Sequence, residues 1–125
     1  MNGRVDNSGR ALISVELEPN RPGACQIEFW IDTGFTGELV ISERLVSRLG
    51  LIQSGSVDAM LADGRQSVLP TYTCEITWFG KVRRLEVVAN DGDVPLLGVG
   101  LLLGKELKID YTNLVLSLLP SGRKI

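Results

Sequence analysis

The stretch ACQIEFWIDTGFTGELVI, which covers residues 24–41, decides the fold. Its first eight residues place an apolar side chain at every second position, which is the pattern of a half-buried strand. Asp32 follows directly, and Gly34 and Gly37 then prevent a regular strand from continuing, because glycines at this spacing indicate special backbone angles and close backbone approach. A short buried strand resumes at Leu39–Ile41. The stretch therefore predicts a strand, a tight loop that opens on a carboxylate, and a second strand.

The segments on either side extend this pattern. Residues 11–17 alternate in the same way, and the turn signal at residues 19–23, with two prolines and a glycine, joins them to the strand before the loop. After the loop, residues 43–49 carry apolar side chains at helical spacing. Ser42 is a good N-cap for this segment, and Gly50 is placed to end it in the left-handed conformation. We therefore expect a hairpin that leads into the loop and a short helix that follows it.

A second hairpin is predicted around an Asp-Gly pair. Strand-like runs at 57–61 and 66–72 flank its tip, which consists of Ala62, Asp63, Gly64 and Arg65. Asp-Gly between two such runs is a strong hairpin signal. An ordinary turn and a lid over a binding site both fit this pattern.

The rest of the chain reads as further short strands. We expect strands at 73–78, 81–88, 94–97, 107–110 and 114–118, and a helical turn at 99–103. Many short strands at close spacing, with one or two short helices, indicate a compact, closed and mostly β barrel. We expect a flexible N-terminal segment over residues 1–10, one domain over residues 11–119 and a C-terminal tail over residues 120–125.

The composition excludes several classes of protein. A chain of 125 residues that is 44% hydrophobic can bury the core of one domain. Its net charge of −2, with scattered Lys and Arg, offers no basic surface for nucleic acid. No apolar run approaches the roughly 20 residues that span a bilayer, and the first ten residues lack the apolar core of a signal peptide. We therefore expect no membrane association and a cytoplasmic location.

The absence of histidine limits the chemistry further. It excludes hydrolases that rely on a histidine base and zinc sites with histidine ligands, which leaves mainly carboxylates for acid-base work. Cys25 and Cys74 lie far apart in the sequence, and we expect small buried thiols, with a disulfide or a reactive role as the alternative. We expect Asp91 and Asp93 to be solvated loop carboxylates instead of metal ligands, because only these two lie close together.

The triplet Asp32-Thr33-Gly34 at the end of a strand, followed by a hairpin and by Leu96-Leu97-Gly98, resembles the retropepsin-like, single-lobed aspartic proteases. The resemblance is strongest to a prokaryotic branch in which Asp-Thr-Gly-Phe-Thr-Gly precedes a short apolar strand. It covers residues 11–119 and includes the order of the elements. The triplet alone also fits an Asx-type turn that closes a hairpin.

The resemblance implies a role for each of these residues. Asp32 would be the catalytic carboxylate, Thr33 would hydrogen-bond across a dimer, and Gly34 would lie beside the substrate backbone. Leu96, Leu97 and Gly98 would pass behind the loop and support it. The tip residues Ala62 to Arg65 would form a flap that contacts substrate. No metal or organic cofactor is implied.

The single copy of the triplet predicts a quaternary structure. Aspartic protease chemistry uses two carboxylates that share a proton, so one Asp32 per chain implies a homodimer that hydrolyses peptide or protein substrates. The terminal strand Leu114–Leu118 is the candidate for part of the interface, as in the family that the sequence resembles. A partner lobe from another protein is the alternative source of the second carboxylate.

Three features depart from the retroviral members of this family. The acidic residue that they use to hold substrate main chain is replaced by Thr36, and the arginine that follows their second glycine is replaced by Val99. Asp63 and Arg65 put charge at a flap tip that is otherwise rich in glycine. These departures leave open an alternative function, a catalytically weak or inactive peptide-binding module with the same dimeric fold.

Overall fold

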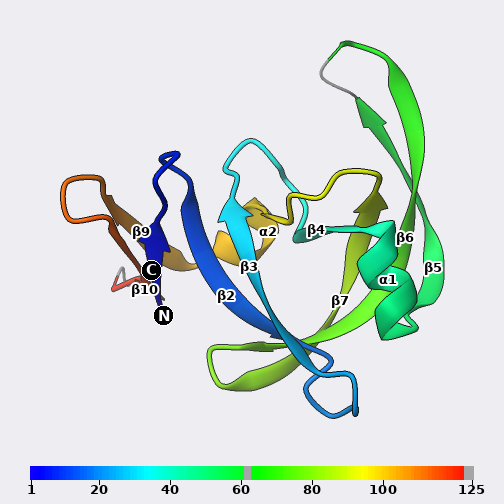
Figure 1. Ribbon diagram of the computed structural model, residues 1–125, viewed down its shortest axis with the longest axis horizontal. Helices are drawn as coiled ribbons and strands as arrows, with labels where there is room; N and C mark the ends of the chain where they lie inside the picture. Colours follow the sequence, from blue (N-terminus) through cyan, green and yellow to red (C-terminus); the bar gives the residue numbers. More distant parts are fainter. Residues whose placement is uncertain (61–62, 123–125) are drawn as a thin grey trace.

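The computed structural model describes residues 1–60 and 63–122, and in them ten strands form one sheet accompanied by two short helices (Figure 1). The elements are β1 (Asn2–Val5), β2 (Ala11–Leu17), β3 (Cys25–Ile31), β4 (Leu39–Ser42), α1 (Glu43–Leu49), β5 (Ile52–Met60), β6 (Gln66–Trp78), β7 (Lys81–Asn90), β8 (Leu96–Leu97), α2 (Val99–Leu102), β9 (Lys105–Asp110) and β10 (Val115–Pro120).

The sheet curls back on itself. Its strand order is β5-β6-β7-β4-β8-β3-β2-β1-β10-β9, and an additional pairing joins β6 to β2. This pairing, in which Glu16 lies opposite Thr77 and Leu17 opposite Ile76, links the two halves of the sheet around one interior. The expectation of a compact, closed and mostly β barrel with one or two short helices is confirmed in its β architecture and its two helices, but the barrel is only partly closed, and β1, β10 and β9 extend beyond it (Figure 1).

The apolar positions of the alternating strands fill this interior. On β2 the buried residues Ile13, Val15 and Leu17 face inward at every second position, and Phe29 does the same on β3. Other fully buried side chains come from β4, β6, β8, α2 and β10: Leu39, Ile41, Ile76, Leu97, Leu101 and Leu118. Burying one such side chain stabilises a fold by about 1.5–3 kcal/mol, so the core fixes β3 and β8, the two strands that carry the predicted site.

Helix α1 begins and ends where its caps predict. The Leu45 N–H donates to Ser42 Oγ at 3.1 Å, and Gly50 ends the helix with φ 64° and an N–H directed at Ser47 O. Leu45, Val46 and Leu49 are its buried face.

The N-terminal segment differs from the prediction. Asn2–Val5 form a regular strand that lies between β2 and β10, whereas we expected a flexible segment over residues 1–10. The Leu118 N–H donates to Met1 O at 2.7 Å, and the Val5 N–H donates to Leu114 O at 3.0 Å. These partners are more than a hundred residues away in the sequence, so no local pattern signals the strand.

The bounds of three further strands also differ. β6 runs without interruption where we expected two strands at 66–72 and 73–78, and β10 continues to Pro120, beyond the expected end at 118. β8 has two residues instead of the four expected at 94–97.

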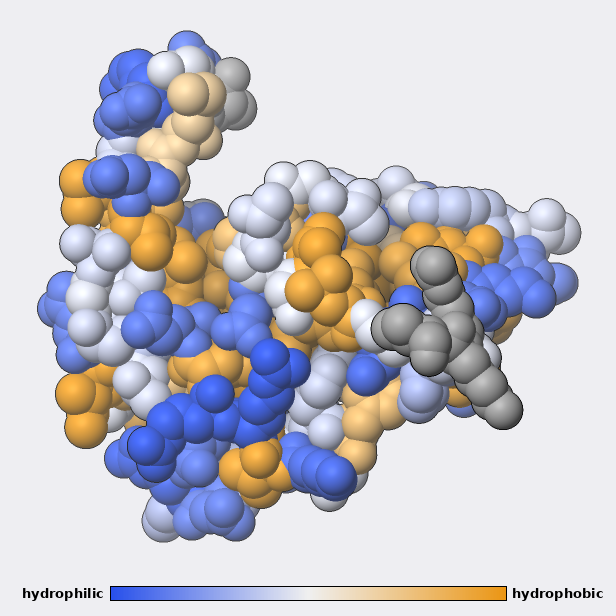
Figure 2. Space-filling model, turned by 180° about the vertical axis from the view of Figure 1, so that it is seen from behind, coloured by the Kyte–Doolittle hydropathy of each residue, from blue (hydrophilic) through white to orange (hydrophobic). Residues whose placement is uncertain are grey.

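The β5–β6 hairpin projects from the body of the molecule (Figure 1), and the space-filling view shows it standing clear (Figure 2). Its turn contains Gly64 at φ 86°, and the Arg65 N–H donates to Asp63 Oδ1 at 3.0 Å. The predicted tip residue Ala62 lies outside the described residues. Among the helices described, none is both long enough and apolar enough to cross a membrane.

Candidate active site

Asp32 lies at the end of β3, where the chain leaves the sheet. Its N–H donates to Leu97 O at 2.9 Å, and its own carbonyl accepts from the Phe35 N–H at 3.2 Å. The Gly34 N–H donates to Asp32 Oδ1 at 2.9 Å. The backbone of the turn and one carboxylate oxygen are thereby held in place.

The second oxygen of this carboxylate distinguishes Asp32 from other aspartates in similar turns. Asp6, Asp63 and Asp110 also accept a hydrogen bond from the N–H two residues ahead, and each also uses its Oδ2, with Arg10, Arg65 and Asn113 as partners. Asp32 Oδ2 has no hydrogen bond or ion pair to any part of the chain that the structure describes. An ordinary Asx turn therefore explains the hydrogen bond to Asp32 Oδ1 but not the lack of a partner for Oδ2.

The carboxylate opens on a pocket of about 360 Å³. Trp30, Ile31, Asp32, Thr33 and Leu96 line it. Asp32 is half-buried, whereas Thr33 and Gly34 are exposed. A carboxylate so placed is accessible to water and to a substrate, and it can act as a general base or a general acid.

Strand β8 passes between β3 and β4 directly behind the loop. It pairs in parallel with β3, with Leu97 opposite Ile31, and antiparallel with β4, with Leu97 also opposite Leu39. Leu97 is fully buried. The two residues of β8 thus tie the start and the end of the Asp32 loop to one buried strand.

Gly98 continues this support because it has no side chain. A Cβ at this position would lie 2.5 Å from Phe35 O and still closer to Gly37 O. The close approach allows the Gly98 N–H to donate to Glu38 O at 2.9 Å and the Val99 N–H to donate to Phe35 O at 2.8 Å. The predicted support segment therefore contacts the loop through its backbone.

Two further contacts hold the loop, and no local sequence pattern predicts either of them. The Phe35 ring lies against both Gly37 and Gly98. Glu38 accepts from Arg83 Nη2 of β7 at 3.0 Å and so ties the end of the loop to the neighbouring strand. These residues are 45 positions apart in the sequence, which is why local patterns could not have found the pair.

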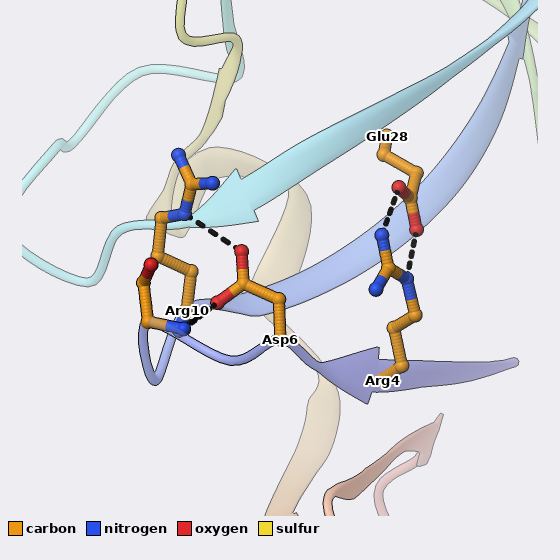
Figure 3. A network of polar contacts seen from close by, with 5 residues as sticks. Arg4, Asp6, Arg10 and Glu28 are labelled. Carbon is orange, nitrogen blue, oxygen red and sulfur yellow. Dashed lines mark hydrogen bonds and ion pairs between the residues drawn. The ribbon is translucent and has the colours of Figure 1, made fainter.

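Figure 3 shows a network of polar contacts beside the N-terminal strand. Its four residues, Arg4, Asp6, Arg10 and Glu28, line a separate pocket of about 220 Å³ together with Trp30. Arg4 donates to both carboxylate oxygens of Glu28 at 2.8 Å, and Arg10 donates to Asp6 from its side chain at 2.8 Å and from its backbone at 2.9 Å. The Arg10 guanidinium lies 5.9 Å from the centre of the Trp30 ring. The β1–β2 loop therefore places a cation next to a residue that also lines the Asp32 pocket.

These hydrogen bonds act on the two carboxylates of the network. The N–H of Arg10 lowers the pKa of Asp6 from its usual range, with help from the Arg10 side chain and the Ser8 N–H. The Arg4 guanidinium lowers the pKa of Glu28. No local pattern predicts the pairing of Arg4 with Glu28, and the Asp6–Arg10 spacing around Gly9 is the one local signal in this network.

The structure brings most of the predicted site residues together, but not all of them. Asp32, Thr33 and Leu96 line one pocket, and Gly34, Leu97 and Gly98 belong to the same hydrogen-bonded unit. Thr36 is exposed in the loop. The tip residues Asp63, Gly64 and Arg65 do not line this pocket.

The cysteines and the remaining acidic residues form no additional site in the described part of the chain. Cys25 and Cys74 are free, and burial raises the pKa of the Cys74 thiol to about 12. Asp91 and Asp93 are exposed. Among residues 1–60 and 63–122, no three His, Cys, Asp or Glu side chains gather as a metal site would require.

Comparison with known proteins identifies the fold. No protein-family model matches the sequence, and no curated protein sequence matches it. The structure is similar to the crystal structure of a retropepsin-like aspartic protease from Rickettsia conorii, with a TM-score of 0.66 and 20% sequence identity over 95% of this chain and 88% of that one. The chain therefore has the fold of a retropepsin-like aspartic protease.

Proposed function

We propose that this chain is an aspartic endopeptidase that acts as a homodimer, with Asp32 of each chain forming the catalytic pair. One observation carries the proposal: Asp32 lines an open pocket, is held by its turn through Oδ1, and has no partner for Oδ2 among the described residues. The retropepsin-like fold supports it. A single chain supplies one such carboxylate, so the reaction requires a second chain.

The chemistry follows from placing two carboxylates together. At a separation of about 3 Å and an effective dielectric of about 20, two negative charges repel by about 5 kcal/mol, so the pair retains one proton over a wide pH range. The ionised carboxylate takes a proton from a water molecule, whose oxygen attacks the carbonyl carbon of the scissile peptide. The protonated carboxyl donates its proton to the carbonyl oxygen. The resulting tetrahedral intermediate then loses the amine, whose nitrogen receives a proton from the pair.

The remaining residues have supporting roles in this proposal. Thr33 contacts the partner loop, and Gly34 and Thr36 lie along the substrate backbone. Leu96, Leu97 and Gly98 keep the Asp32 turn in position. The β5–β6 hairpin, with Asp63, Gly64 and Arg65 near its tip, closes over the substrate as a lid, and its exposed apolar side chains Met60 and Val68 are then covered.

The proposal also covers which residues form the catalytic unit and in which compartment the enzyme acts. The catalytic unit spans residues 2–120, because β1 and β10 pair with each other and β1 also pairs with β2. It requires no metal or organic cofactor. Two free thiols suit a reducing compartment, which supports a cytoplasmic location.

A peptide-binding module without turnover is the second candidate. It is favoured by the neutral, exposed Thr36, since no charged side chain at that position anchors the substrate backbone. Fold alone does not confer activity, so the two candidates are separated only by turnover.

The test compares wild-type protein with Asp32→Asn in the hydrolysis of a fluorogenic peptide library between pH 3 and pH 8. The amide oxygen can still accept from the Gly34 N–H, so the variant keeps its fold and dimer. Because it cannot supply the ionised base, turnover falls by at least about a hundredfold. Asp91→Asn, an exposed carboxylate outside the pocket, serves as the control and keeps full activity.

Wild-type activity follows a bell-shaped pH profile on the acidic side of neutral, because the pair needs one proton and only one. A statine-type mimic, whose hydroxyl replaces the attacking water, inhibits. Near-normal turnover by Asp32→Asn would refute the mechanism. Peptide binding by wild-type protein without any cleavage would favour the binding module.

A further inference from the structure

A pocket of about 350 Å³ lies beside the β2–β3 turn, at the opposite end of β3 from Asp32 (Figure 1). It shares no lining residue with the Asp32 pocket. Its volume is at the low end of the range for small-molecule sites. The residues that give it its chemistry are Glu18 and Arg21 of the turn, Leu51 and Ile52 at the start of β5, Glu75 of β6 and Arg84 of β7.

Glu18 supplies this pocket with a buried carboxylate. Its side chain is only 7% exposed, and its partner in the described part of the chain is Arg21 Nη1, at 3.8 Å. At this distance the contact is an ion pair and not a hydrogen bond. A buried charge is favourable only when it is paired and also hydrogen-bonded. Glu18 can therefore still accept hydrogen bonds from a donor in the pocket.

The backbone holds Glu18 in an unusual conformation. Its φ of 51° is in the left-handed region, which residues with a side chain rarely adopt. The Glu18 N–H donates to Glu75 O at 2.8 Å, and its carbonyl accepts from the Arg21 N–H at 3.2 Å. Strained residues that neighbouring contacts hold in place are concentrated at ligand sites. The position of this carboxylate is thus fixed before any ligand binds.

Glu75 and Arg84 lie directly opposite each other on β6 and β7. Opposite charges at such cross-strand positions are close enough to form a pair. In residues 1–60 and 63–122, however, neither side chain takes part in an ion pair or a hydrogen bond, and both line the pocket. The wall of the pocket therefore places an unpaired anion and an unpaired cation side by side.

The rim of the pocket is apolar. The Ile52 side chain is 77% exposed, and Leu51 beside it is half-buried. Covering such side chains with an apolar group removes them from water, which is favourable. A matching ligand therefore has a cationic donor, an anion next to it, and an apolar group.

We propose that this pocket binds a free α-amino acid with an aliphatic side chain. The ammonium group of the ligand donates to Glu18 and Glu75, and its carboxylate accepts from Arg84. Its side chain covers Leu51 and Ile52.

The spacing of the charges selects this class of ligand. Because Glu75 and Arg84 are cross-strand neighbours, the two charges of the ligand must also be close together, and an α-amino acid carries both on one carbon. A longer peptide separates its ammonium and carboxylate groups and can satisfy only one of the two side chains. The site uses no residue of the Asp32 pocket, so it does not depend on the proposed peptidase activity.

The test is a titration of the isotope-labelled full chain with L-leucine, followed by the amide chemical shifts in NMR spectra. Saturable shifts are expected at Glu18, Arg21 and Ile52. Three analogues each lack one recognised part: N-acetyl-L-leucine lacks the ammonium group, L-leucinamide lacks the carboxylate, and glycine lacks the aliphatic side chain. Each analogue binds at least about tenfold more weakly than leucine, because it loses a charged hydrogen bond or the apolar contact.

Two variants test the side chains directly. Glu18→Gln keeps the length of the side chain but removes its charge, and Arg84→Gln removes the cation. Each raises the dissociation constant for leucine by at least about tenfold. Glu106→Gln, an exposed residue of β9 outside the pocket, is the control and binds leucine like wild type.

Circular dichroism checks folding, and Arg84→Gln, at an exposed position, decides the outcome if Glu18→Gln does not fold. The absence of saturable shifts up to about 20 mM leucine would overturn the proposal. Equal affinity for leucine and its analogues, or wild-type affinity in a folded variant of the pocket, would overturn it as well.

Discussion

Replacing Gly98 by alanine tests the support of the Asp32 loop directly. The added Cβ would lie 2.5 Å from Phe35 O and closer still to Gly37 O and to the Phe35 ring. The two oxygens belong to the backbone and cannot rotate away, so the loop must move relative to β8. Gly98 itself has φ −103°, which alanine adopts without strain, so any effect comes from this contact.

The expected cost can be worked out from the contacts that shift. Overpacking of this kind costs about 1–3 kcal/mol. The Gly98–Glu38, Val99–Phe35 and Gly100–Gly37 backbone hydrogen bonds, at 2.8–2.9 Å, lengthen together, and each contributes about 1 kcal/mol when intact. Because these hydrogen bonds lengthen but are not all lost, we expect the free energy of unfolding to fall by about 2–4 kcal/mol.

The assay is urea unfolding at one fixed protein concentration, because the proposed dimerisation would couple to stability. Gly23→Ala is the control, since a Cβ at this position meets nothing within 4 Å. We expect this substitution to change the free energy of unfolding by less than about 1 kcal/mol. If the proposed function holds, peptidase activity in Gly98→Ala falls as well, because the Asp32 turn moves with the loop. Equal unfolding midpoints for the two variants would refute the argument that this close approach holds the loop.

Two further predictions concern titratable groups. Because burial raises the pKa of the Cys74 thiol to about 12, an alkylating reagent at pH 8 labels half-buried Cys25 first, and mass spectrometry that found equal rates in the folded protein would contradict this. Asp6 has a folded-state pKa below its unfolded value, so its contribution to stability is complete above about pH 4 and is lost as the pH falls through the folded pKa. Asp6→Asn therefore flattens the dependence of the urea midpoint on pH between about 5 and 2, and a dependence as steep as that of wild type would contradict the assignment.

The sequence predicts the elements whose signals are local. Alternation defined β2 and β3, and α1 could be placed to the residue because Ser42 and Gly50 cap it by interactions within a few positions. The Asp-Gly hairpin was also found, although its strands proved longer than expected: β5 begins at Ile52, and β6 is continuous to Trp78. Strand lengths depend on neighbours in the sheet, which local patterns do not contain.

What the sequence missed is held by contacts between distant segments. β1 has no apolar alternation, and it is a strand because β2 and β10 supply partners on both sides. The tie between Glu38 and Arg83 and the cation of Arg10 above Trp30 depend on the same long-range pairing. The candidate site was predictable at Asp32 to Gly34 and at Leu96 to Gly98, but not the polar network around it.

The hydrogen bonds around Asp32 bear on why the proposed reaction needs a second chain. Backbone contacts from β8, Gly98 and Val99 hold the loop around Asp32, whereas the carboxylate itself receives one described hydrogen bond, from the Gly34 N–H. A carboxylate that only closed a turn would gain stability from a second donor, as Asp6 and Asp110 do. In one chain, the half-buried Asp32 has no donor to Oδ2 from the described residues, so this oxygen is left to water or to another chain. In the proposed dimer a second Asp32 carboxyl would share a proton with this oxygen, so the atom that the turn leaves unpaired is the one that the proposed chemistry uses.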